Sequence, residues 1–132
     1  MRKLKLQVQT SIDGFIAGPS HEMNWLKLPW TEDLITYVRE LTAPVDLILL
    51  GKNLAEGFIP YWTEVSKNPS SPDFEGGVKF TTTPKIVFSK NLQASKWENT
   101  VVASGDLIEE ISNLKNQSGS DIIAYGGAQF VA

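Results

Sequence analysis

The stretch Asp46-Leu47-Ile48-Leu49-Leu50-Gly51-Lys52-Asn53 decides the fold class. Its short, continuous apolar run is typical of a strand that is covered on both faces. A glycine and a lysine follow the run directly, and a short helical stretch to about Gly57 comes next. A strand that passes straight into a helix is the building unit of α/β proteins.

Four further segments have the pattern of a strand. Residues 4–12 alternate with a period of two, which places Leu4, Leu6, Val8, Thr10 and Ile12 on one face. The other three predicted strands are Lys85–Ser89, Thr100–Ala103 and Asp121–Tyr125. Strands that alternate with helical patterns predict a three-layer α/β/α fold with a mostly parallel central sheet.

The helices are predicted from caps and from a period of 3.6 residues. Thr31 is a suitable N-cap for a helix that ends before Pro44. Ser104 is a suitable cap for a second helix, whose apolar face consists of Leu107, Ile108, Ile111 and Leu114. Residues 60–83 contain several prolines and glycines, and we expect a long, partly helical surface excursion there.

Length and composition limit the functional classes. A chain of 132 residues, with 42% apolar and 20% charged residues, fits one globular domain over 1–132. No apolar run approaches the ~20 residues that span a bilayer, so we expect no membrane partner. The net charge of −3 argues against nucleic acid. The chain has no cysteine and one histidine, which fits a cytoplasmic protein and predicts no metal site.

Three predicted strands end in residues that suit anions. These ends are Gly51-Lys52-Asn53, Ser89-Lys90 and Gly126-Gly127. Ligands of parallel sheets bind beyond the carboxyl ends of the strands, and helix N-termini there favour phosphate groups. The pattern predicts a ligand with several phosphates, such as a nucleotide, although ordinary turns use the same residues. Neither a Gly-x-Gly-x-x-Gly motif nor a P-loop occurs.

In their order and spacing these segments resemble the dihydrofolate reductase-like superfamily. The resemblance is closer to the branch of the riboflavin-biosynthesis reductase, the C-terminal domain of bacterial bifunctional deaminase-reductases. It is carried by these segments: Ser11–Ala17, Met23-Asn24-Trp25, Leu49–Asn53, Lys85–Lys90 and Asp121–Gly127. A strand, two glycines and only about five helical residues form the end of the chain. We therefore expect the native protein to continue, and the family's C-terminal strands to be missing.

The resemblance implies an NADPH-dependent reductase that transfers hydride to a small heterocycle, pyrimidinone-like or pterin-like. Backbone groups of Ile16 and Ala17 would face the nicotinamide. The resemblance implies that the cofactor's phosphates are held by Gly51, Lys52 and Asn53. The adenosine 2′-phosphate would be contacted by Ser89 and Lys90. The pyrophosphate would be cradled by Gly126, Gly127, Ala128 and Gln129. Lys52 and Lys90 stand where the family usually has arginine, so their phosphate contacts lack a bidentate fork. The family also implies a homodimer.

The proton donor is assigned to one of two carboxylates. Asp33 has a setting similar to the helix carboxylate of folate-reducing enzymes, where burial would raise the pKa. Asp13 precedes Gly14 beside the implied substrate. Each also has a plain structural interpretation, as a first-turn acid and as a turn residue. Trp25, Trp30 and Phe58 are candidate walls for a planar substrate. A true dihydrofolate reductase and a non-catalytic nucleotide-binding module remain as alternatives.

Overall fold

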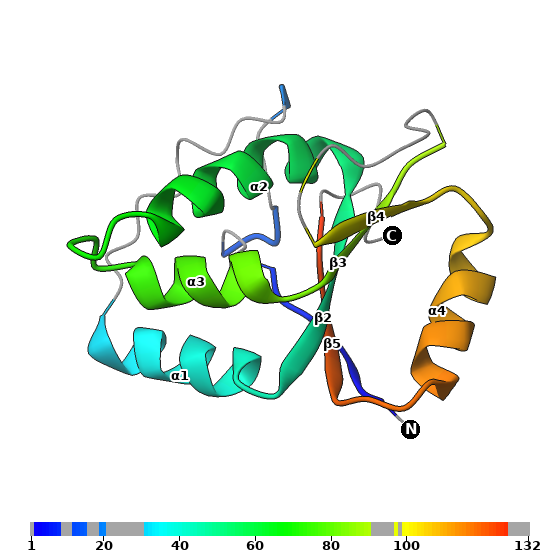
Figure 1. The fold of residues 1–132 in the computed structure, drawn as a ribbon, viewed down its shortest axis with the longest axis horizontal. Helices are drawn as coiled ribbons and strands as arrows, with labels where there is room; N and C mark the ends of the chain where they lie inside the picture. The colour runs from blue at the N-terminus through cyan, green and yellow to red at the C-terminus, as the bar shows by residue number, and fades with distance from the viewer. Residues whose placement is uncertain are drawn as a thin grey trace.

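The computed structural model describes residues 2–8, 12–15, 19–20, 31–90, 97 and 99–126. Its strands form one sheet in the order β1-β5-β2-β3-β4, and every neighbouring pair is parallel (Figure 1). The strands are β1 (Leu4–Leu6), β2 (Val45–Gly51), β3 (Lys85–Phe88), β4 (Thr100–Ala103) and β5 (Asp121–Tyr125). The helices are α1 (Glu32–Thr42), α2 (Lys52–Ser66), α3 (Phe74–Thr82) and α4 (Leu107–Asn116).

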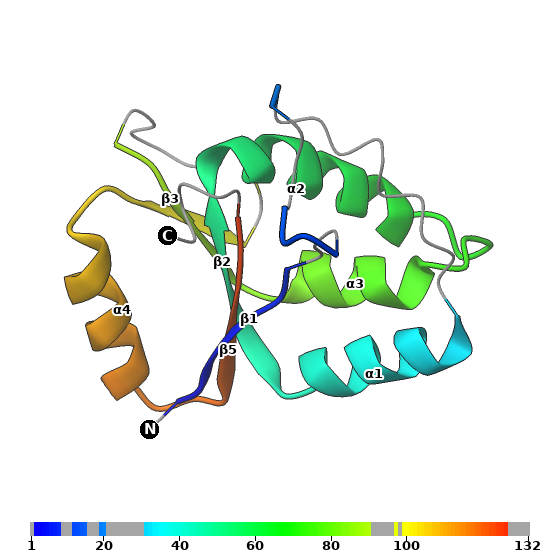
Figure 2. The ribbon, with the colours of Figure 1, turned by 180° about the vertical axis from the view of Figure 1, so that it is seen from behind.

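The helices cover both faces of the sheet. Figures 1 and 2 show α1, α2 and α3 together on one side, and α4 alone on the other. The three-layer α/β/α arrangement and the parallel sheet are therefore confirmed. None of the helices within the described ranges is both long enough and apolar enough to cross a membrane.

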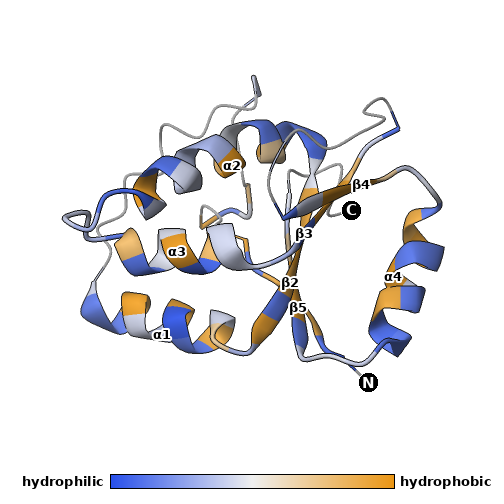
Figure 3. Cartoon of the chain, in the orientation of Figure 1, coloured by the Kyte–Doolittle hydropathy of each residue, from blue (hydrophilic) through white to orange (hydrophobic). Residues whose placement is uncertain are grey.

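Strand β2 lies in the middle of the sheet and supplies both halves of the core. Val45, Ile48 and Leu50 pack with residues of α2 and α3, whereas Leu47 and Leu49 pack with Leu114 of α4. Figure 3 shows the apolar residues concentrated on the strands and on the helix faces next to them. Because side chains of a strand alternate between faces, a run without polar interruption is needed where both faces are covered.

Strand β1 is shorter than predicted and lies at an edge. The pattern predicted a strand over residues 4–12, but β1 ends at Leu6, residues 7–8 are irregular, and residues 12–14 turn. Leu6 is 52% exposed, so the alternation does not produce a buried face here. An edge strand has a neighbouring strand on one side only, so fewer elements pack over its side chains. The alternating pattern does not show whether either face of such a strand is buried.

The predicted excursion over residues 60–83 is partly helical, as expected, but its helices α2 and α3 pack together, and the predicted helix end near Gly57 is wrong. Helix α2 continues to Ser66 with Pro60 inside it. Proline removes one backbone donor, but Pro60 lies on the exposed side of α2, while Ala55 and Ile59 are buried on the other. Packing of that face outweighs the local preference.

Gly77 sets the close approach of α3 to α2. It is buried in α3, and a Cβ atom there would lie 2.8 Å from Val65 Cγ1 and 3.0 Å from the backbone nitrogen of Ser66. A residue without a side chain is therefore required at this crossing. Of the glycines that suggested a loop, Gly77 instead allows two helices to pack.

Two predicted caps differ in detail. Thr31 is the N-cap residue of α1, but its hydroxyl donates to Asp33 Oδ1 and makes no cap bond to the backbone. Helix α4 is capped by Asp106, whose Oδ1 accepts from the Glu109 N–H at 3.0 Å, and not by Ser104. Ile108 is 77% exposed, so the covered face of α4 consists of Leu107, Ile111 and Leu114.

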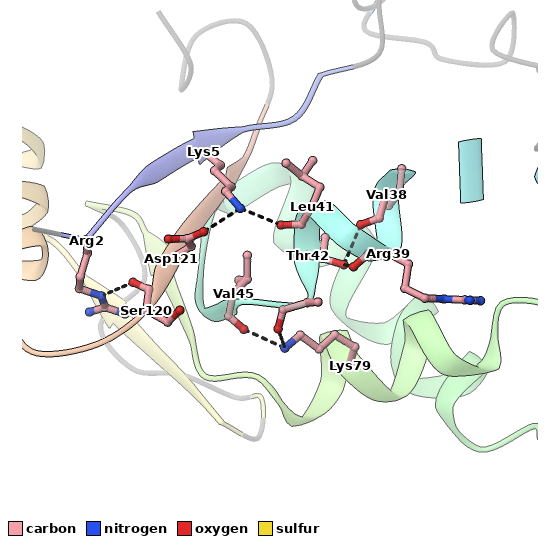
Figure 4. A network of polar contacts seen from close by, with 11 residues as sticks. Arg2, Lys5, Val38, Arg39, Leu41, Thr42, Val45, Lys79, Ser120 and Asp121 are labelled. Atoms are coloured by element: carbon pink, nitrogen blue, oxygen red, sulfur yellow. Dashed lines mark hydrogen bonds and ion pairs between the residues drawn. The ribbon is translucent and has the colours of Figure 1, made fainter. Parts of the chain in front are cut away.

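Polar contacts tie the amino-terminal edge of the sheet together (Figure 4). Arg2 is buried, forms an ion pair with Asp46, and donates to the Ser120 carbonyl at 2.9 Å. Lys5 joins Asp121 at 2.7 Å and the Leu41 carbonyl at 3.0 Å. These contacts hold β1, β5 and the end of α1 in place at this edge.

Candidate functional site

The strand register places the predicted anion-binding residues along one edge of the sheet. Gly51 of β2 pairs with Phe88 of β3, and Leu50 pairs with Tyr125 of β5. The residues that follow these positions are Lys52, Ser89 and Gly126. Strands β2 and β5 run upward in Figure 1, so their ends and the start of α2 lie at the top of the view. The structure therefore brings the three described strand ends together, as the sequence predicts.

The start of α2 has the features that favour an anion at this edge. Its N-cap is Gly51, which has no side chain to cap the first backbone N–H groups, and its first turn contains no acid. Helices α1, α3 and α4 each have acidic residues in the first turn. The backbone N–H groups of this first turn and the positive end of the α2 dipole favour an anion, to which Lys52 and Asn53 add a cation and an amide.

Gly51 itself has an ordinary backbone. Its φ of −72° and ψ of 153° lie in the extended region, which any residue can adopt. The glycine is buried between neighbouring strands. The conformation therefore does not require glycine at this position. What Gly51 would contribute to an anion site is the absence of a side chain beside the first turn of α2.

Ser89 and Lys90 continue the edge beyond β3. The Ser89 N–H donates to the Ala103 carbonyl at 3.0 Å, which anchors the turn to β4, and Lys90 is exposed. A hydroxyl and a cation at adjacent positions suit a phosphate monoester. Gly126, directly after β5, completes the described part of this edge.

Phe58 contacts Tyr125, a residue that the sequence pattern does not single out. The ring of Phe58 in α2 lies 6.5 Å from the ring of Tyr125, between centroids, at an angle of 55°. The Tyr125 hydroxyl donates to Gln7 Oε1 at 3.5 Å, and burial raises the pKa of this phenol to about 12. The sequence signal for a role of Tyr125 is its position immediately before Gly126-Gly127. Its contacts with Phe58 and Gln7 depend on the order of the strands in the sheet, which the sequence pattern does not reveal.

Asp33 lacks the environment expected of a proton donor. It is exposed in the first turn of α1, and a hydrogen bond from Thr31 lowers its pKa below the ordinary value. The expectation of a buried carboxyl with a raised pKa is therefore wrong for Asp33. Figures 1 and 2 place the beginning of α1 at the end of the molecule away from the sheet.

Asp13 occupies the turn that the sequence predicts. It is exposed and precedes Gly14, whose φ of 90° lies in the region that favours glycine. The turn follows β1, whose carboxyl end belongs to the same edge as those of β2 and β5. The remaining predicted site residues, Ile16, Ala17, Trp25, Trp30, Gly127, Ala128 and Gln129, lie outside the described residues.

Together, the fold and the edge define an α/β domain with a doubly covered parallel sheet and an anion-friendly carboxyl edge. The sequence matches the RibD C-terminal domain over residues 2–132, so the chain belongs to that family. This confirms the resemblance to the riboflavin-biosynthesis reductase branch and to the dihydrofolate reductase-like superfamily. Among curated proteins, it is 25% identical over 132 residues to the uncharacterized protein YyaP of Bacillus subtilis (strain 168). It covers 65% of that relative's length, whereas 98% of this chain is matched.

Solved structures agree on the fold. A Shewanella sp. PV-4 protein, provisionally named as a riboflavin biosynthesis protein, matches with a TM-score of 0.64 at 20% identity, over 98% of this chain and 67% of that chain. The deaminase/5-amino-6-(5-phosphoribosylamino)uracil reductase of Thermotoga maritima gives 0.56 at 19% identity, over 95% and 39%. Dihydrofolate reductase from Enterococcus faecalis, in complex with NADP(H) and RAB-propyl, gives 0.51 at 18% identity, over 98% and 61%. The chain thus has a reductase-like fold.

Proposed function

We propose that this protein is an NADPH-dependent reductase that transfers hydride to a small heterocyclic substrate. The observation that carries the proposal is the acid-free start of α2 after its N-cap Gly51, with Lys52 beside it, in one row with Ser89-Lys90 and Gly126. The proposal is also supported by the family and by a dihydrofolate reductase of the same fold, which was solved with NADP(H).

The residues of the edge fit a dinucleotide with an additional phosphate. The first backbone N–H groups of α2 and Lys52 hold the diphosphate, which needs several donors and positive charge. Lys90 and the Ser89 hydroxyl bind the 2′-phosphate, which distinguishes NADPH from NADH. Bound NADPH supplies the hydride, and the protein's part is to orient it against an electron-poor acceptor and to exclude water.

The proposal is tested by titrating NADPH and NADH into the wild-type protein and two lysine variants, followed by tryptophan fluorescence. Lys52→Ala is expected to weaken both cofactors about tenfold, since both carry the diphosphate. Lys90→Ala is expected to weaken NADPH about tenfold and to leave NADH unchanged. Lys67→Ala, an exposed lysine just beyond the other end of α2, is the matched control and changes neither. Equal losses for the two cofactors in Lys90→Ala would remove the 2′-phosphate assignment.

A true dihydrofolate reductase receives no support from Asp33. That reaction was tied to a buried helix carboxyl, whereas Asp33 is exposed and its pKa is lowered. Turnover separates the remaining possibilities. A reductase oxidises NADPH when pyrimidinones or pterins are supplied, whereas a non-catalytic module binds NADPH and oxidises none of it.

A further inference from the structure

A cavity of about 620 Å³ lies at the amino-terminal edge of the sheet, opposite the edge proposed for the cofactor. It is lined by residues at the starts of β2, β3 and β4 and by the last turn of α4. Among the elements that the structure describes, α4 stands alone on this side of the sheet (Figures 1 and 2). None of the described residues proposed for the cofactor belongs to the lining. The volume falls within the range of about 300–1,000 Å³ that is typical of small-molecule sites.

The floor of the cavity is apolar and is only partly covered. Leu47 of β2 and Leu114 of α4 are buried there and pack in one half of the core. Ile86 of β3 is half-buried, and Val101, its partner in the register with β4, is 64% exposed. Strand β4 is the last strand of the described sheet, so no further strand of that sheet lies beside Val101. A ligand body that covers Ile86 and Val101 would remove apolar surface from water, which favours binding.

Asp46 and Arg2 form the charged end of the cavity. The Arg2 side chain is 7% exposed and lies against Gly119, where a Cβ atom would lie 2.8 Å from Arg2 Cζ. The Asp46 side chain is 45% exposed, so the ion pair presents its negative member to the open side. Asp46 Oδ1 accepts from Arg2, and Oδ2 accepts from the Ser120 N–H at 2.8 Å. A carboxylate has about four acceptor positions, which leaves capacity for a further donor.

Among the described residues that line the cavity, Asp46 is the charged group that remains open to solvent. Partial burial raises the pKa of Asp46, but hydrogen bonds from its two partners lower it more, so the pKa lies below its ordinary value and the group is ionised at neutral pH. Lys85 also lines the cavity, but its amine donates to the Thr81 and Thr83 carbonyls at 3.1 and 2.9 Å. These carbonyls belong to the end of α3, on the other side of the sheet. The cavity therefore favours a cation.

We propose that this cavity binds a small molecule that has a primary ammonium group on an apolar body. The ammonium donates to the Asp46 carboxylate, and the apolar body lies on Ile86 and Val101. The same body with a carboxylate would be repelled by Asp46, and a neutral body would gain the apolar contact alone. The inference does not depend on the proposed function, because its residues lie at the opposite edge of the sheet from those proposed for the cofactor.

Three probes of one shape test the inference: 2-phenylethylamine, the neutral 2-phenylethanol and the anion phenylacetate. Each is titrated into the isotope-labelled protein, and the shifts of the backbone amide signals give both the dissociation constant and the place of binding. We expect 2-phenylethylamine to shift the amides of Leu47, Ile86 and Val101. At low salt it should bind about fivefold more tightly than 2-phenylethanol, the contribution of a partly exposed ion pair. Phenylacetate should bind more weakly than the alcohol, and added salt should remove the advantage of the amine.

Two variants separate the charge from the apolar contact. Asp46→Asn removes the charge and keeps an oxygen for Arg2, and we expect it to bind 2-phenylethylamine no better than 2-phenylethanol. Val101→Thr keeps the shape of an exposed side chain and makes it polar, so we expect both probes to weaken about two- to threefold. Asp73→Asn and Ile108→Thr are the matched controls at exposed positions outside the cavity, and they should alter neither constant.

A folding control accompanies Asp46→Asn, because that variant alters the partner of Arg2. Its urea unfolding is measured beside the titrations. If it is unfolded, the three probes with the wild-type protein and with Val101→Thr decide the inference. The inference is overturned if 2-phenylethanol or phenylacetate binds as tightly as 2-phenylethylamine, if the amide shifts lie away from Ile86 and Val101, if folded Asp46→Asn keeps the full preference for the amine, or if no probe binds.

Discussion

Replacing Gly77 by alanine tests the packing of α2 against α3, which gives α2 its length and position. The added Cβ would lie 2.8 Å from Val65 Cγ1 and 3.0 Å from the Ser66 nitrogen. The valine can rotate, but the backbone nitrogen moves only with the helix. Overpacking of this kind costs about 1–3 kcal/mol. Alanine also gains up to about 1 kcal/mol of helix propensity over glycine, so the net loss is smaller.

The preceding residue provides a matched control. Gly76 lies in the same helix and is exposed, and a Cβ atom there would make an ordinary contact of 3.8 Å with Trp62 Cζ3. Gly76→Ala therefore gains propensity without a collision, and we expect it to stabilise the protein by about 0.5–1 kcal/mol. Because the propensity gain is similar in both variants, the difference between them isolates the collision, about 1–3 kcal/mol.

Urea unfolding, followed by tryptophan fluorescence, measures both free energies of unfolding. Thermal unfolding should place the midpoint of Gly77→Ala several degrees below that of Gly76→Ala, since about 1 kcal/mol corresponds to roughly 3–6 °C in a domain of this size. Equal stabilities of the two variants would refute the close approach of α2 and α3, and with it the reason that Pro60 is tolerated inside α2.

Two further predictions concern stability, and one concerns binding. Burial lowers the pKa of Lys85 from 10.5 to about 8. Between these two pH values the Lys85 amine is protonated in the unfolded chain and largely neutral in the folded chain. The unfolding free energy of the wild-type protein relative to Lys85→Met should therefore rise between about pH 8 and 10.5 in urea titrations, and a flat difference would contradict the burial. Asp46→Ala leaves buried Arg2 without its ion-pair partner and should lower the free energy of unfolding by about 1–2 kcal/mol. The loss is modest because water reaches Asp46, and the control Asp73→Ala, at an exposed position, should change the free energy of unfolding little. Lys52→Ala should weaken NADPH and NADH alike in fluorescence titrations, whereas a loss confined to NADPH would move Lys52 to the 2′-phosphate.

The sequence predicted the central strands well because their signal is local. The apolar run of β2 required cover on both faces, and the structure provides it from α2, α3 and α4. Strands β4 and β5 have the predicted bounds, and β3 ends one residue early at Phe88. The three described anion-friendly ends lie together because parallel strands share one carboxyl edge.

The features that could not be predicted depend on contacts between distant segments. Gly57 and Pro60 indicated the end of a helix, but burial of Ile59 on the opposite side keeps α2 intact. Asp33 matched the helix-carboxylate pattern of folate-reducing enzymes. Whether its side chain is buried depends instead on where the first turn of α1 lies relative to the sheet. Tyr125 contacts Phe58 and Gln7 because β5 lies between β1 and β2 in the sheet. The alternation of apolar and polar residues along a strand does not indicate which strands will be its neighbours.

Titrating NADPH and NADH side by side into the wild-type protein is the decisive measurement of whether the carboxyl edge binds NADPH. We expect NADPH to bind at least ~10-fold more tightly than NADH, a difference of about 1.4 kcal/mol, and Lys90→Ala to abolish this preference. Equal affinities for the two cofactors, or no binding of either, would refute binding of NADPH at this edge.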